Sequence, residues 1–225
     1  MDGILVVDKP QGMTSHDVVD LVRRRFGLKK VGHAGTLDPM ATGVLVMLIG
    51  KLTKSSNSFI SDDKEYDATL TLGGRSDTGD AWGKIAPSGT TASFSPSEIE
   101  KAFSAFTGEI EQSPPMYSAV KFKGKKLYEL ARKGISIDVK PRKVVIKRLD
   151  ISSIALPSVS FRVTCSKGTY IRQLCVDIGE TLGCGGYLSR LVRTRSGAFT
   201  VGQAIALDEL KSLDSQALLG RLIYP

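Results

Sequence analysis

Hydrophobic and polar positions along this chain follow strand and helix periods in turn. Apolar runs and period-two alternation predict strands at 3–8, 44–49, 64–73, 144–155, 158–165 and 187–195. Helical spacing predicts helices at 15–26, 95–106, 127–133, 169–182 and 204–213. We expect Ser15 to cap the first helix and Gly27 to end it. Because the strands mostly follow one another without regular βαβ alternation, we predict an α+β fold with a mixed, mainly antiparallel central sheet and flanking helices.

The stretch from Gly32 to Leu45 lies between the first predicted helix and the second predicted strand. It contains three glycines, one proline, one of the two histidines of the chain, and Asp38. Pro39 disfavours a helical backbone at Asp38, and the glycines permit positive φ angles or close backbone approach. Two interpretations follow. The stretch is either a shaped loop that presents Asp38, or a solvated turn with an aspartate before proline.

Composition and charge narrow the classes of function. The chain has 225 residues, 41% of them hydrophobic, and a formal net charge of +8, which suits one large globular domain or two small ones. The range 121–148 holds eleven Lys and Arg against Glu129 and Asp138, a local net charge of +9, so the remainder is near neutral. This concentration favours a surface for a polyanion such as RNA. The alternative is a solvated, lysine-rich loop.

The cysteine and histidine content argues against metal and disulfide chemistry. Three cysteines, at 165, 175 and 184, form no CxxC pair, and two histidines offer no zinc-site spacing. We therefore expect reduced cysteines, no metal and a cytoplasmic protein. The N-terminus is acidic with a four-residue apolar run, unlike a secretory signal, and no apolar run is long enough to span a bilayer. No phosphate-binding glycine loop or dinucleotide fingerprint is present, so we expect no cofactor.

Several segments, taken in order, resemble the motifs of the TruB family of tRNA pseudouridine synthases. The stretch Gly32–Gly43 resembles the catalytic motif of the family. Four others resemble its N-terminal motif, its tyrosine strand and two later motifs, and a weaker sixth follows: Lys9–Ser15, Lys64–Tyr66, Ser113–Lys121, Cys165–Arg172 and Leu191–Gly197. The resemblance implies a pseudouridine synthase fold with a catalytic cleft, a single catalytic domain over 1–225, and a basic RNA-covering segment near 121–148.

The resemblance also implies an activity, the isomerisation of uridine to pseudouridine at position 55 in the T-loop of tRNA. The partner would be the T-arm of tRNA, and we expect a monomer. A uridine in a folded loop must leave its stack before its ring can be reached. Asp38 would be the nucleophile, attacking C1′ or C6 of the flipped uridine. Arg172 would pair with Asp38 and keep it ionised. An arginine in the first turn of a helix also opposes the helix dipole, so its placement requires a partner such as an anion.

The remaining residues of the resemblance would bind the substrate. Tyr66 would stack on the base and act as a general base when the C5 proton leaves, and Tyr170 is a second aromatic face. His33 would contact the RNA backbone or fill the gap left by the base. Leu191, Lys9 and Lys121 would complete the binding surface.

Two departures from the family and two further functions stay open. Family members commonly carry a small C-terminal RNA-binding domain of the PUA-like kind, and we expect no complete one within 1–225. The family often has a second arginine where Val192 stands. The alternatives are a non-catalytic RNA-binding or tRNA-folding protein and a guide-RNA-dependent pseudouridine synthase. Asp38 argues against a pure binder, because a fixed carboxylate beside RNA phosphates costs affinity.

Overall fold

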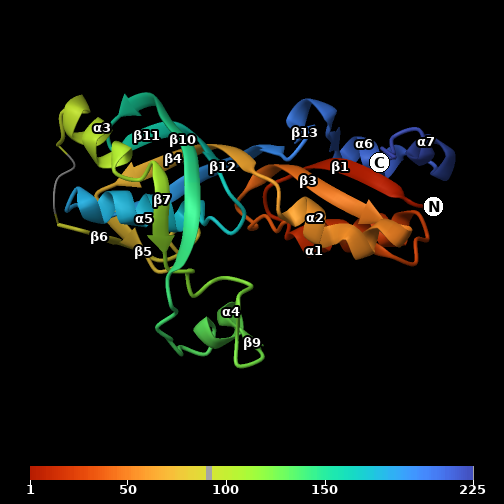
Figure 1. Ribbon diagram of the computed structural model, residues 1–225, viewed down its shortest axis with the longest axis horizontal. Helices are drawn as coiled ribbons and strands as arrows, with labels where there is room; N and C mark the ends of the chain where they lie inside the picture. Colours follow the sequence, from red (N-terminus) through yellow and green to blue (C-terminus); the bar gives the residue numbers. More distant parts are fainter. Residues whose placement is uncertain (90–92, 225) are drawn as a thin grey trace. The chain divides into compact units, whose positions relative to one another are not determined.

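The computed structural model describes residues 1–89 and 93–224, and its chain forms two compact units (Figure 1). Unit 1 comprises Met1–Asp67 and Leu191–Pro225, and unit 2 comprises Ala68–Arg190. Strands β4 (Lys64–Leu72) and β12 (Gly186–Ser196) each run along the chain from one unit into the other. The single catalytic domain expected from the sequence stays a prediction.

Unit 1 is a sheet with helical segments packed against both faces. Its strand order is β14-β1-β3-β12, with β2 also paired to β3 and β13 to β12. The β1–β3 and β2–β3 pairs are antiparallel, whereas β1–β14 and β3–β12 are parallel. Its elements are β1 (Gly3–Lys9), α1 (Ser15–Arg25), β2 (Val31–His33), β3 (Thr42–Ile49), η1 (Gly50–Ser55), α2 (Ser56–Ile60), β13 (Phe199–Thr200), η2 (Val201–Gln203), β14 (Ile205–Ala206), α6 (Leu207–Ser212) and α7 (Ser215–Leu219).

Both faces of the unit 1 sheet are buried, which explains the continuous apolar run in β3. Leu5 and Val7 of β1 lie in one core with Leu45 of β3 and apolar side chains of α1, α6 and α7. Ile4 and Val6 lie in a second core with alternate residues of β3 and with Phe199. Strands buried on both faces lose the alternation typical of a half-solvated sheet. The two cores therefore fix β3, whose first residue follows directly on the Asp38 loop.

Unit 2 contains strands in the order β4-β11-β10-β7, and the β10–β11 and β10–β7 pairs are antiparallel. Helices α3 and α5 supply apolar side chains: Phe103 packs edge-on against Phe161 of β11 at a centroid distance of 5.3 Å. Its elements are β5 (Gly74–Ser76), β6 (Ile85–Pro87), α3 (Pro96–Ser104), β7 (Gly108–Gln112), β8 (Lys121–Phe122), β9 (Lys125–Lys126), α4 (Leu127–Ala131), β10 (Arg142–Ala155), β11 (Ser158–Cys165) and α5 (Ile171–Thr181).

These elements confirm the predicted α+β class with a mixed, mainly antiparallel sheet. All six predicted strands form, within two residues at each end. The prediction that Ser15 caps the first helix is wrong. Thr14 is the N-cap and forms a capping box with Asp17, so the Ser15 hydroxyl is available for another partner. The predicted helix at 169–182 is shorter and begins at Ile171, and the one at 204–213 begins at Leu207.

Candidate active site

The loop between β2 and β3 carries Asp38, and hydrogen bonds to Gly12 and to Ser15, the first residue of α1, hold it on both sides of Asp38. The Leu37 N–H donates to Ser15 Oγ (2.8 Å), and the Ser15 hydroxyl donates back to the Leu37 carbonyl (3.2 Å). On the other side of Asp38, the Gly12 N–H donates to the Pro39 carbonyl (2.9 Å). Leu37 itself is buried, which anchors the chain next to the carboxylate. The loop is therefore a shaped and supported one, as the first of the two interpretations predicted.

Asp38 is half-buried within this loop, and the turn that follows it closes with an Ala41 N–H···O=C bond to Asp38 (3.0 Å). The cation of Lys9 lies within electrostatic reach of it. Lys9 is the last residue of β1, has an exposed fraction of 0%, and donates from Nζ to the carbonyls of Pro10 (2.8 Å) and Met13 (2.6 Å). Burial lowers the pKa of Lys9 to about 8, and the charge of Asp38 opposes that change.

Arg193 is a second buried cation at this loop, and the sequence reasoning missed it. Its guanidinium donates from Nε to the Val44 carbonyl (2.7 Å), from Nη2 to the Gly35 carbonyl (3.1 Å) and from Nη1 to the Thr36 carbonyl (3.4 Å). A signal for it existed in the sequence. In the alternation of β12, Arg193 shares a face with the buried Leu191, so the pattern places a charge on an apolar face.

His33 ends β2 and lies next to His16 of α1. The two rings meet edge-on at a centroid distance of 5.9 Å. The Nδ1 atom of His33 is buried and has no hydrogen-bond partner. Burial lowers the pKa of His33 to about 4, helped by the charges of His16 and Arg193, so the ring is neutral at physiological pH. His33 can thus offer a neutral hydrogen-bonding ring to a ligand.

Tyr66 and Leu191 also belong to unit 1, on β4 and β12. Tyr66 has an exposed fraction of 9% and shares its strand face with the buried Ala68, Leu70 and Leu72, as the alternation predicted. Leu191 is likewise buried. Both side chains supply apolar surface, and their contact with a base stays a prediction.

Arg172 and Tyr170 lie in unit 2, at the start of α5. Arg172 has an exposed fraction of 4% and donates to the carbonyls of Thr78 (2.7 Å) and Tyr117 (2.8 Å), with its Nε 3.7 Å from Asp80 Oδ2. Asp80 is thus an anionic partner of the kind that its position in the helix requires. Tyr170 is the N-cap residue of α5 and exchanges two main-chain bonds with the side-chain amide of Gln112. The pairing of Arg172 with Asp38 of unit 1 stays a prediction.

Within unit 2, residues 121–141 of the basic segment extend away from β7 and β10 (Figure 1), and residues 142–148 belong to β10 itself. It contains the short β8–β9 hairpin and α4, and Lys121 is exposed on β8. The cations of Lys126 and Arg132 both lie 5.4 Å from the centre of the Tyr128 ring. A cluster of one half-buried and one exposed cation around an aromatic ring fits the predicted nucleic-acid surface, and the solvated-loop alternative stays open.

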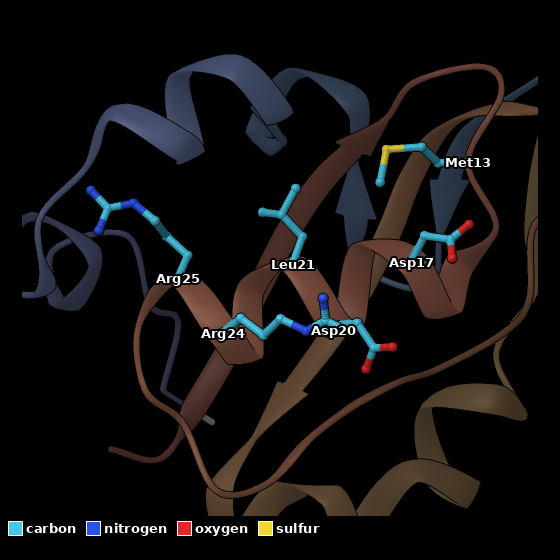
Figure 2. A pocket seen from close by; sticks show the side chains of 6 residues that line it. All are labelled: Met13, Asp17, Asp20, Leu21, Arg24 and Arg25. Carbon is cyan, nitrogen blue, oxygen red and sulfur yellow. The ribbon is translucent and has the colours of Figure 1, made fainter.

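A separate pocket of about 500 Å³ lies on the surface of α1 and is lined by none of the predicted site residues. Figure 2 shows Asp17 and Arg25 at opposite ends of it, with Leu21 between them.

Over residues 1–89 and 93–224, no group of three His, Cys, Asp or Glu side chains could hold a metal ion. In the same residues no helix is long and apolar enough to cross a membrane. The three cysteines are buried and free.

Comparison with known proteins gives the family. The family model described as TruB family pseudouridylate synthase (N terminal domain) matches residues 23–171, and the tRNA pseudouridylate synthase B C-terminal domain matches 172–225. A protein of Alkaliphilus oremlandii (strain OhILAs) named tRNA pseudouridine synthase B is 51% identical over 226 residues, which cover 100% of this chain and 75% of that protein. The protein of the same name from Opitutus terrae is 44% identical and is covered to 92%.

Solved structures agree at the level of the fold. A chain of a Cbf5-Nop10-Gar1 complex matches with a TM-score of 0.74 and 33% identity, over 93% of this chain and 53% of that one. A chain of an H/ACA RNP bound to a substrate RNA containing 2′-deoxyuridine matches with a TM-score of 0.69 and 30% identity, over 93% and 52%. This chain therefore spans about half the length of these two solved chains. With both family models and the near full-length relatives in agreement, the chain belongs to the TruB family of pseudouridylate synthases.

Proposed function

We propose that this chain isomerises uridine to pseudouridine in tRNA, at position 55 of the T-loop. Relatives that are 51% and 46% identical over 100% and 99% of the chain bear the name tRNA pseudouridine synthase B. The observation in the structure that carries the proposal is the support of the Asp38 loop. Ser15, Gly12 and Arg193 hold the main chain around one half-buried carboxylate. A nucleophile has to be held in this way, because small displacements of a reacting group cost rate steeply.

The reaction is an isomerisation, so no oxidant and no energy source enters it. The bond between N1 of uracil and C1′ of the ribose breaks, the uracil rotates, and a bond between C5 and C1′ forms. The proton on C5 leaves, and N1 gains a proton, so atoms and electrons balance. The carboxylate of Asp38 attacks C1′ or C6 of the nucleotide and is released when the new bond is complete. The protein must supply an ionised nucleophile, an aromatic surface for the flipped base, and a base for the C5 proton.

Tyr66 is our candidate for two of these tasks. Its ring is continuous with the apolar face of β4, and a stacked uracil would extend that face. Its hydroxyl would accept the proton from C5. Leu191 and Tyr170 would border the base, and the neutral His33, with its unpartnered Nδ1, would bind the RNA where the base has left the stack.

Arg172 is proposed to pair with Asp38, as the family resemblance implies. Its hydrogen bonds to Thr78 and Tyr117 and its ion pair with Asp80 would keep the guanidinium in one orientation. Contact between Lys9 and RNA stays a prediction. The hydrogen bonds from Lys9 to the carbonyls of Pro10 and Met13 support a role beneath the Asp38 loop. Lys121, which is exposed, and its basic segment would contact the phosphates of the T-arm. We place the reaction in the cytoplasm, where the free thiols stay reduced, and expect a monomer.

Incubation of the purified chain with an unmodified tRNA transcript, followed by mapping of pseudouridine, tests the proposal. We expect product at position 55 without any guide RNA or second protein. Product that requires a guide RNA would favour the guide-dependent alternative.

Asp38→Asn should abolish turnover and retain tRNA binding, because the amide keeps the size of the carboxylate and cannot act as the nucleophile. Asp208→Asn is the matched control, since Asp208 is an exposed carboxylate paired with Lys211 on α6. Turnover by Asp38→Asn at the parent rate contradicts the assignment.

A further inference from the structure

The guanidinium of Arg193 lies beneath the loop that carries Asp38. Arg193 has an exposed fraction of 1% and is among the largest fully buried side chains of the described residues. A buried charge is costly unless hydrogen bonds satisfy it. Here the three bonds go to main-chain carbonyls, two of them in the loop at Gly35 and Thr36 and one at Val44 of β3. The side chain thus links the start of the loop to the strand that follows it.

Two glycines allow this close approach. Gly43 pairs with Arg193 in the β3–β12 register, and its φ is +98°. A Cβ added at Gly43 would lie 2.3 Å from the Arg193 carbonyl oxygen, so no other residue fits there without a shift of the backbone. Gly35 has a φ of +102°, which a side chain rarely adopts. The local backbone is therefore shaped around the arginine.

Arg193 also contributes to the electrostatics of the residues around Asp38. After burial, its charge is one of the causes that lower the pKa of both Lys9 and His33. Its guanidinium bonds three carbonyls inside unit 1 and is almost inaccessible, so contact with RNA is not its task. It acts on the site through the loop.

We infer that Arg193 is a positioning residue for Asp38, which fixes the main chain of the loop at Gly35 and Thr36 and so serves the chemical step rather than RNA binding. This inference rests on the proposed function. The planar fork of arginine reaches three carbonyls at once, whereas the ammonium of lysine is a single point charge. Arg193→Lys therefore keeps the charge and loses the geometry.

The test uses the full chain with Arg193→Lys, and Arg195→Lys as the matched control. Arg195 lies on the same strand and donates to the Gly197 carbonyl, away from the loop. Single-turnover release of tritium from tRNA labelled at C5 of uridine reports the chemical step, and filter binding reports the Kd for tRNA. We expect Arg193→Lys to lower the single-turnover rate by about 100-fold and to change Kd by less than about threefold. Arg195→Lys should change neither by more than about twofold.

Hydrogen exchange separates positioning from general support of the fold. Peptides that cover residues 34–40 should lose protection in Arg193→Lys, while those of β1 and α1 keep theirs. The inference is overturned if Arg193→Lys keeps the single-turnover rate of the parent, or if its rate and its affinity for tRNA fall together. It is also overturned if the variant loses exchange protection throughout unit 1. If Arg193→Lys does not fold, Gly35→Ala moves an acceptor of the same guanidinium and must give the same split between rate and Kd. An inactive parent protein overturns the proposed function, and the exchange measurement then still decides whether Arg193 fixes the loop.

Discussion

Ser15→Ala removes the hydroxyl that forms hydrogen bonds with the main chain of Leu37, the residue before Asp38. Ser15 and Leu37 are both buried, so the Leu37 N–H would lose its partner without access to bulk water. An unsatisfied buried donor costs about 1–3 kcal/mol of the free energy of unfolding. For a chain of this size, a loss of about 2 kcal/mol corresponds to a fall in Tm of about 4–8 °C. The carbonyl of Leu37 loses a weaker bond, at 3.2 Å, and adds little to this cost.

The same change should slow catalysis, because the loop loses the hydrogen bond at Leu37 and keeps only the one at Pro39 beside Asp38. We expect the single-turnover rate to fall by about 10–100-fold with an unchanged Kd for tRNA. Thr14→Ala is the matched control at the neighbouring position. Thr14 accepts a bond from the Asp17 N–H as the helix cap and has no bond to the loop, so its loss costs about 1 kcal/mol and should leave the rate near that of the parent.

Thermal unfolding and rapid-quench turnover of the two variants show whether Ser15 supports catalysis through the loop or contributes only to stability. If Ser15→Ala lowers Tm and leaves the rate unchanged, Ser15 is only a core hydrogen bond and the loop needs no fastening at Leu37. If both variants lose rate to the same extent, the start of α1 matters as a whole, and the link from Ser15 to Leu37 has no special part in the reaction.

Three further predictions concern charge, RNA contact and proton transfer. Folded Lys9 releases its proton near pH 8 whereas the unfolded chain holds it to about 10.5, so the cost of the buried charge disappears as the pH rises through this window. In denaturant titrations, the free energy of unfolding of the parent minus that of Lys9→Met should therefore rise by up to about 3 kcal/mol between pH 7.5 and 10.5, and a constant difference contradicts the burial of a charged Lys9. Neutralising Lys123, Lys125 and Lys126 together should flatten the log–log salt slope of tRNA binding by about 0.7–0.9 per phosphate contact, and an unchanged slope makes the segment a solvated loop. Tyr66→Phe should cleave the glycosidic bond and fail to release the C5 proton, and turnover at the parent rate reduces Tyr66 to a stacking surface.

Local patterns were sufficient for most of the fold. Period-two alternation located β4, because its two faces differ in burial from residue to residue. β7 and β2 are among the antiparallel strands that were missed, for the opposite reason. β7 has the sequence GEIEQ, with one aliphatic residue, and forms because β10 pairs with it from Gln112 to Gly108. β2 has three residues and is defined by its pairing with the end of β3. Strands of this kind depend on a partner that a local pattern does not contain.

The helix starts illustrate how side-chain competition moves a boundary. Ser15 and Thr14 are both good N-cap residues, and the sequence reasoning chose Ser15. Thr14 wins the cap because Asp17 stands three residues later and completes a capping box with it. The consequence reaches the site. With the cap at Thr14, the Ser15 side chain faces the interior and bonds Leu37, so an error of one residue in the predicted helix start conceals a contact that supports the Asp38 loop.

The candidate site divides into residues that sequence can identify and residues that only the fold reveals. Asp38 stands out because Pro39, the next residue, restricts its backbone directly, and the glycines nearby in the chain permit positive φ angles on either side of it. Its supports are distant: Ser15 and Leu37 are 22 positions apart, and Arg193 and Gly35 are 158 apart. The alternation of β12 places Arg193 on a buried face, yet it cannot say which carbonyls satisfy the charge. These carbonyls lie within reach of Arg193 because β12 pairs in parallel with β3 at Gly43, which brings the arginine under the Asp38 loop. A motif thus indicates the proposed nucleophile, Asp38, and the sheet that joins two remote segments determines how firmly its loop is held.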